Sequence, residues 1–167
     1  MARLVLLLVL CGLGTSACGG GDDGGSAPLP IVGSIPEAIA ALEEFYGSPQ
    51  EYFEISARLD SIGFVVAVDD ATAAEQGSWT PEDGLVEPEP VGEASGATFT
   101  ADQIDLESDR IFDRIFAELD DPTIIDLAIQ CGPDGTVIYD ASIASEAGGV
   151  LLVLLGPDGS IRAVQGQ

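Results

Sequence analysis

Carboxylates are the abundant functional groups of this 167-residue chain, which has 29 Asp and Glu, five Lys and Arg, and a net charge of −24. Histidine is absent and all five cations are arginines. The composition therefore excludes Ser-His-Asp and Cys-His catalysis, histidine-ligated metals and lysine Schiff bases. Nucleic-acid binding is disfavoured, since phosphate neutralisation requires clustered Lys and Arg. We expect partners that are cationic, or that bind mainly through apolar and backbone contacts.

Three adjacent carboxylate pairs, Glu43-Glu44, Asp69-Asp70 and Asp120-Asp121, are candidates for acid–base or calcium chemistry. Neighbours in a strand point to opposite faces and neighbours in a helix diverge by about 100°, so adjacency does not make a catalytic dyad. The D-x-[DN]-x-[DN]-G calcium loop is absent. We therefore expect no enzyme, metal site or cofactor. A carboxylate hydrolase is the less favoured alternative, and it would need two buried carboxylates about 5–9 Å apart in a cleft.

The N-terminus has the features of an export signal. Arg3 precedes the apolar run Leu4 to Leu13, and small residues then lead into Cys18. As a helix, this run would span about 15 Å, half of a bilayer core. The sequence Gly14-Thr15-Ser16-Ala17-Cys18 resembles the lipobox of bacterial lipoproteins, which implies that Cys18 is acylated and becomes the mature N-terminus. The alternative is ordinary secretion, because Thr-Ser-Ala also resembles a small-x-small cleavage site.

These features divide the chain into a signal peptide (1–17), a flexible Gly/Asp/Ser/Pro tether (18–33) and a single domain (34–167). A tract of this composition is typical of a tether that holds a domain away from a membrane. The expected location is the outer face of the cell membrane, with the lipid on Cys18 as anchor.

The domain contains one cysteine, Cys131, and one tryptophan, Trp79. Cys131 ends an alternating strand pattern in which Ile125 and every second residue after it are expected to face the core. With no cation near it in sequence, this favours a small buried hydrophobe over a reactive thiol. Trp79 lies in a segment rich in Gly, Pro, Glu and Ser, residues 75–98, which we predict to be a long loop with one weak hairpin near Glu82. Trp79 either covers the core or forms an exposed binding tip.

Helical spacing over Ile35 to Tyr46 predicts a first helix, with Ser34 and Glu37 as a capping box and Gly47 as its end. Alternation then predicts a hairpin of strands around 53–59 and 64–68. A second helix is predicted from about Ser108 to Leu119, followed by strands at about 123–131, 135–144, 149–156 and 160–166.

The tetrapeptide Gly-Pro-Asp-Gly occurs twice, at 132–135 and 156–159. In both places it predicts a type I turn followed by a bulge with glycine at positive φ. Because Val150 to Leu155 is apolar at every position, we predict a central strand there, covered on both faces.

The two halves of the domain show weak self-similarity. A shift of 73 residues aligns Ile39, Leu42 and Pro49 with Phe112, Ile115 and Pro122. This favours two repeats, about 34–98 and 99–167. The fold class expected is α+β: a tandem helix-plus-antiparallel-meander repeat, with two helices packed on an antiparallel sheet.

The second half, with Gly135 to Asp140 and Val153 to Ile161, is similar to PepSY-like proteins, and two such units in tandem resemble β-lactamase-inhibitor-like proteins. The resemblance implies a non-enzymatic domain that binds or inhibits envelope proteins, and it carries over no functional residue. We therefore expect an acidic binding or inhibitory lipoprotein of the envelope. The alternative is an apolar-ligand or lipid carrier.

Overall fold

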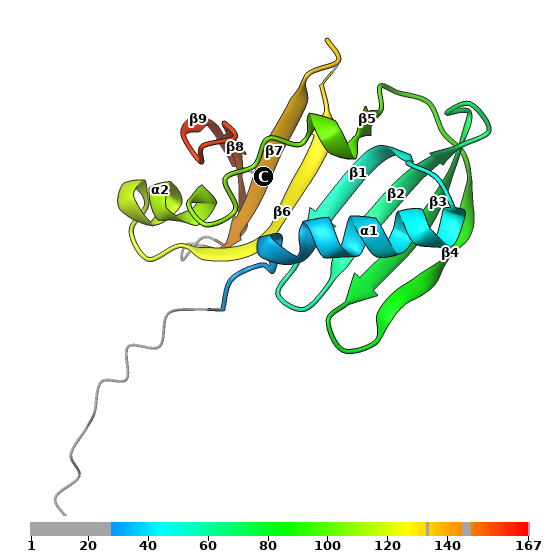
Figure 1. Cartoon of the computed structure of the whole chain (residues 1–167). Coiled ribbons are helices and arrows are strands. Elements are labelled where there is room, and N and C mark those ends of the chain that lie inside the picture. The colour runs from blue at the N-terminus through cyan, green and yellow to red at the C-terminus, as the bar shows by residue number, and fades with distance from the viewer. Residues whose placement is uncertain (1–27, 133, 145–147, 167) are drawn as a thin grey trace, which may run out of the picture.

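The computed structural model describes residues 28–132, 134–144 and 148–166, and the signal peptide, Cys18 and most of the tether lie outside these ranges. Figure 1 shows the helices and strands, which follow one another along the chain as η1 (Val32–Ser34), α1 (Ile35–Tyr46), β1 (Glu51–Ala57), β2 (Ile62–Val68), β3 (Ala73–Thr80), β4 (Gly84–Glu93), β5 (Phe99–Thr100), η2 (Ala101–Gln103), α2 (Ile111–Glu118), β6 (Thr123–Cys131), β7 (Val137–Ala144), β8 (Val150–Leu155) and β9 (Ile161–Gly166).

The predicted α+β class, a tandem helix-plus-antiparallel-meander repeat, is wrong, because the protein is mainly β and its strands form one continuous sheet. Within the described residues, nine strands form one antiparallel sheet in the order β4-β3-β2-β1-β6-β7-β8-β9, with the short β5 paired to β1. The two α-helices have only 12 and 8 residues. The main reason for the difference is the segment 75–98, which was expected to be a loop and instead supplies two strands.

Strands β3 and β4 form in spite of their Gly, Pro and Glu content because the sheet supplies their partners. β3 pairs along its length with the apolar strand β2, and β4 pairs with β3 at the edge of the sheet. An edge strand tolerates proline, since one side of its backbone needs no partner; Pro88 and Pro90 both lie in β4. Trp79 is 5% exposed and belongs to the core, so the core-covering alternative is confirmed.

Helix α1 has the predicted extent, and Gly47 ends it with φ of 73°. The predicted capping box is wrong. The turn η1 runs directly into α1, so Ser34 has helical rather than extended backbone angles and its side chain caps nothing. Two tyrosine hydroxyls connect the helix and sheet: Tyr46 donates to Glu75 at 2.5 Å, and Tyr52 donates to Glu43 at 3.3 Å.

Strands β6 to β9 agree closely with the predicted ranges, but two side-chain placements differ. A bulge between Ile124 and Asp126 shifts the alternation, so Ile124 is buried while Ile125 is 41% exposed. Strand β8 is the penultimate strand of the sheet, with only β9 beyond it, and Leu152 and Leu154 are only half-buried. The prediction that β8 is covered on both faces is therefore wrong.

At both Gly-Pro-Asp-Gly sequences the structure confirms a closing hydrogen bond and a last glycine at positive φ. Gly135 N–H donates to Gly132 O and Gly159 N–H donates to Gly156 O, both at 2.9 Å. The closing glycines Gly135 and Gly159 have φ of 82° and 77°. In each turn the Asp carboxylate accepts hydrogen bonds from the side chain and backbone two residues later, which lowers the pKa of Asp134 and Asp158.

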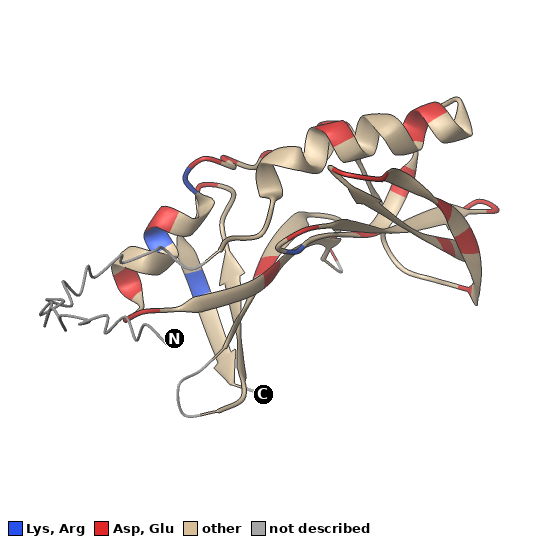
Figure 2. Ribbon diagram, turned by 90° about the horizontal axis from the view of Figure 1, so that it is seen from below, with Lys and Arg blue, Asp and Glu red and all other residues tan. Residues whose placement is uncertain are grey.

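Both helices contribute to one hydrophobic core on one face of the sheet. The buried side chains of α1 and α2 pack with alternate residues of the strands, among them Ile55, Phe64, Leu127 and Val153. Figure 2, which views the molecule from below, shows the two helices along one side of the sheet and the C-terminal strands bending toward the other side. No helix in the described part of the chain is long and apolar enough to cross a membrane.

Candidate functional site

None of the helices in the described ranges lies over the face of the sheet opposite to α1 and α2, and we call this face the open face. Its members are the side chains that alternate with the core positions of β1, β2, β6, β7 and β8. They are Glu54, Ser56, Gly63, Val65, Ala67, Asp126, Ala128, Gln130, Ile138, Asp140, Ser142, Leu152 and Leu154. The open face is therefore acidic, with small residues at its centre.

One row of directly paired residues crosses the open face. Gly63 pairs with Ser56, Ser56 with Ala128, Ala128 with Asp140, and Asp140 with Leu154. Residues paired in this way place their side chains on the same side of the sheet. At one end of the row a distance confirms that two paired residues face the same side: a Cβ atom on Gly63 would lie 2.8 Å from the Ser56 hydroxyl. The three residues of the row that precede Asp140, namely Gly63, Ser56 and Ala128, are therefore all small.

Asp140 is the most unusual residue of the open face. It is 8% exposed and is the buried charged side chain among the described residues. Its carboxylate accepts no hydrogen bond and forms no ion pair with any of them, and burial alone raises its pKa. In the described ranges, every side-chain oxygen or nitrogen that is completely shielded from solvent has a hydrogen-bond partner. Because Asp140 has no partner there, its oxygens must remain in contact with solvent.

Two further carboxylates lie near Asp140. Glu54 is half-buried, and its pKa is raised first by burial and then by the charge of Asp126, with a smaller contribution from Asp140; Arg58 acts in the opposite direction. Asp126 lies two residues from Ala128 on β6, and Asp140 lies opposite Ala128 on β7. Glu54, Asp126 and Asp140 thus surround Ala128, and we call them the carboxylate triad.

The triad does not have the geometry of a metal centre. No three acidic or cysteine side chains in the described ranges are grouped closely enough to hold a metal ion. Nor is there a pair of buried carboxylates in that part of the chain, as the hydrolase alternative requires, because Asp140 is buried and its two neighbours are only half-buried. The arrangement can offer several negative charges, spread over neighbouring strands, to a larger cation.

An apolar pocket of about 270 Å³ lies on the helix side of the sheet, where the start of α1 meets the segment 101–108. Val32, Ile35, Ile39 and Leu106 are among its lining residues. Pockets for small ligands usually have volumes of about 300–1,000 Å³. This pocket is below that range, so it gives little support to the lipid-carrier alternative.

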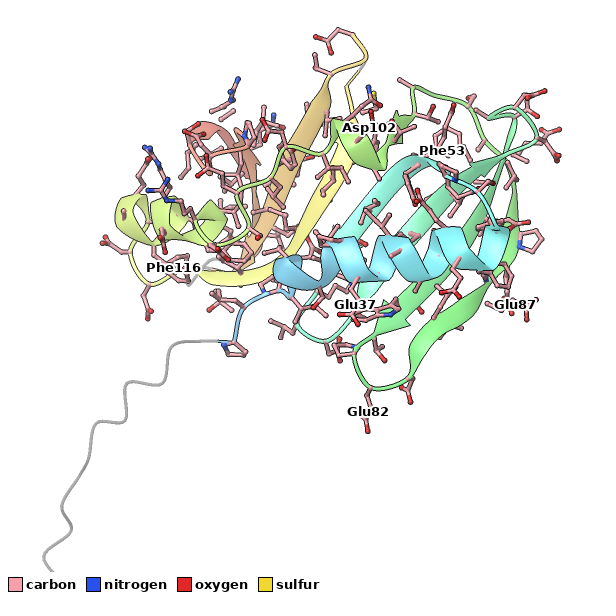
Figure 3. All side chains as sticks on the ribbon, viewed as in Figure 1. Glu37, Phe53, Glu82, Glu87, Asp102 and Phe116 are labelled. Atoms are coloured by element: carbon pink, nitrogen blue, oxygen red, sulfur yellow. The ribbon has the colours of Figure 1, made fainter. Side chains whose placement is uncertain are left out.

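The residues singled out from sequence do not meet at one site. Cys18 lies outside the described residues, Trp79 lies in the core, and Cys131 is half-buried at the edge of the core. The adjacent carboxylate pairs lie at the end of α1, in the β2–β3 turn and before β6, and none of them belongs to the open face. Other acidic side chains point outward from exposed positions, such as Glu37 on α1 and Glu82 in the β3–β4 turn (Figure 3).

The carboxylate triad was missed because each member is separated from the others in sequence. A signal was available, since Asp is uncommon inside strands and both Asp126 and Asp140 fall within predicted strands. Alternation places each of them on the side of its strand opposite to the buried residues. The sequence does not show, however, that β1, β6 and β7 are neighbours or that no helix covers this side.

Comparison with known proteins finds one structural likeness. No protein family model matches the chain, and no curated protein matches it in sequence. The crystal structure of a candidate lipoprotein from Clostridium difficile 630 superposes with a TM-score of 0.55 at 11% sequence identity, covering 84% of this chain and 95% of that chain. The two proteins share a fold. The resemblance to PepSY-like proteins stays a prediction.

Proposed function

We propose that the chain is a lipid-anchored protein of the bacterial cell envelope whose domain binds a cationic protein partner through the open face. The lipoprotein part rests on Gly14 to Cys18 and is supported by the fold shared with a candidate lipoprotein. The binding part rests on one observation: Asp140 is 8% exposed and has no partner among the described residues, on a sheet face that none of the described helices covers. Burial disfavours the ionised form of this carboxylate, and a cationic partner would offset that cost.

The charge of the molecule supports a cationic partner. With 29 acidic residues and a net charge of −24, the chain is repelled by anionic surfaces and attracts positively charged ones. Arg58 is the cation that acts on the triad, and it is exposed. Binding should therefore be faster and tighter at low salt, because exposed charges are screened beyond roughly 8–10 Å at physiological ionic strength.

The lipid anchor is tested by the substitution Cys18→Ser. We expect the variant to stay unacylated and to leave the membrane fraction, because the lipid on Cys18 is the proposed anchor. Membrane and soluble fractions are compared by immunoblot, with Cys131→Ser as the matched control that should fractionate like the original protein. Retention of the Cys18→Ser variant in the membrane would contradict the proposal.

The binding face is tested by photo-crosslinking in intact cells. A photoreactive amino acid is placed at Ser142 on the open face in one variant, and at Glu37 on the exposed side of α1 in another. We expect one defined crosslinked product from position 142 and none from position 37, with a yield that falls as salt is raised. A product from position 37 alone, or the same products from both positions, would show that the open face is not the binding face.

A further inference from the structure

The part of the open face around Ala128 combines small side chains with neighbouring carboxylates, which suits a cationic side chain. Ala128 has a single methyl group, and its direct neighbour across β1 is Ser56, so this part of the open face lacks large side chains. Asp140 stands opposite on β7, and Asp126 and Glu54 stand beside it. Ile138 and Leu154 lie next to Asp140 and supply apolar surface on the far side.

From this arrangement, and resting on the proposed binding function, we infer that the open face recognises an arginine side chain of the partner, whose guanidinium lies over Ala128 within the carboxylate triad. Directly opposed residues in a sheet have Cβ atoms about 4.5–5.5 Å apart, and diagonal neighbours are about 7–8 Å apart. The three carboxylates are spread over this spacing and, within the described ranges, are not grouped closely enough to hold a metal ion. A guanidinium can span it, since it is planar and carries five N–H donors.

Arginine fits better than lysine for two reasons. Asp140 is only 8% exposed, so an approaching cation must lose much of its water, and a guanidinium is more weakly hydrated than an ammonium group. Its fork of donors can also satisfy Asp140 and a neighbouring carboxylate at the same time, whereas an ammonium acts as a point charge. The aliphatic stem can pack on Ile138 and Leu154.

The test uses a short peptide as probe, N-acetyl-Gly-Arg-Gly-amide, with the soluble Cys18→Ser protein. Backbone amide resonances are followed by NMR during titration. We expect saturable shifts at Ala128, Asp140 and Ser142. The citrulline peptide, which has nearly the same shape without the charge, should give no shifts, and the lysine peptide should bind severalfold more weakly. Equal shifts with the citrulline peptide, or arginine shifts spread over α1 and the β3–β4 turn, would overturn the inference.

Two substitutions in the same titration identify the site. Asp140→Asn should weaken binding of the arginine peptide by about tenfold, since it removes the recessed charge. Ala128→Leu should abolish binding by filling the space, while the distant amide resonances of α1 stay unchanged. Glu87→Gln removes a charge from the exposed part of β4 and should leave the affinity unaltered. Unchanged affinity in the Asp140→Asn variant would contradict the inference.

Failure of this inference can be separated from failure of the proposed function. If crosslinking from Ser142 persists in the Asp140→Asn variant and the arginine peptide gives no localised shifts, the open face binds a partner by other contacts. If the peptide binds as described but Ser142 gives no crosslink in cells, the site recognises arginine and the proposed partner binding is wrong.

Discussion

Replacing Gly159 by alanine should lower the free energy of unfolding by about 3 kcal/mol, the sum of left-handed backbone strain and overpacking. Gly159 closes the β8–β9 turn with φ of 77°. An added Cβ atom would also lie 2.6 Å from the backbone oxygen of Ile111, at the first residue of α2. The Cβ position is fixed by the backbone of Gly159, and the oxygen belongs to the backbone of Ile111. Neither atom can therefore move away without straining the chain. Urea denaturation followed by circular dichroism measures the loss.

The chain provides a matched control in its other Gly-Pro-Asp-Gly turn. Gly135 has nearly the same φ, 82°, but an added Cβ atom there meets nothing within 4 Å. Gly135→Ala should therefore destabilise the protein by the backbone term alone, about 1–2 kcal/mol. Equal losses in the two variants would mean that the β8–β9 turn does not pack on the start of α2 in solution.

Replacing Asp140 by asparagine should have the opposite effect and raise the free energy of unfolding at pH 7, because it removes the charge that burial disfavours and keeps a side chain of nearly the same shape. Burial raises the pKa of Asp140 in the folded protein above its value in the unfolded chain. A raised pKa means that the stability contributed by this group is complete below the unfolded pKa and is lost as the pH rises through the folded pKa. The asparagine variant has no carboxyl group to ionise at this position, so it keeps this stability as the pH rises.

The pH dependence distinguishes an effect of the Asp140 charge from a general change in stability. Thermal or urea unfolding of both proteins between pH 3 and 8 should show similar stabilities at the acidic end and a growing advantage for Asp140→Asn above it. Glu87→Gln is the control, because this exposed side chain carries a similar charge without burial. A variant that is less stable than the original protein at neutral pH would show that Asp140 has a structural partner, and the argument for a binding role would fail with it.

A stability gain together with a loss of arginine binding would identify Asp140 as a residue kept for function. Side chains that lower the stability of a fold and have no structural partner are commonly found at binding and catalytic positions. In this protein the carboxylate sits between Ala128 and Leu154 in the sheet, where an apolar residue would pack without difficulty. Its two effects can be measured on the same variant.

Local patterns in the sequence predicted most of the short-range structure correctly, with the capping box at Ser34 as the exception. The extent of α1, the β1–β2 hairpin, the strands β6 to β9 and both Gly-Pro-Asp-Gly turns follow from periodicity and from the freedom of glycine at positive φ. Errors arose where pairing with strands distant in sequence determines the local structure. The segment 75–98 has a loop-like composition, yet β2 offers backbone partners to β3, and β3 in turn pairs with β4 at the edge of the sheet. The bulge at Ile124 reversed one alternation in the same way.

The sequence by itself determined the negative charge, the absence of histidine and lysine, and the lipobox-like segment that ends at Cys18. These features exclude mechanisms and indicate a location, because they depend only on which groups are present. Only the tertiary structure decided that Glu54, Asp126 and Asp140 meet around Ala128. Strand order sets which residues become neighbours, and the packing of both helices on one side leaves the other side open. Neither the strand order nor the placement of the helices can be inferred from the spacing of residues along the chain.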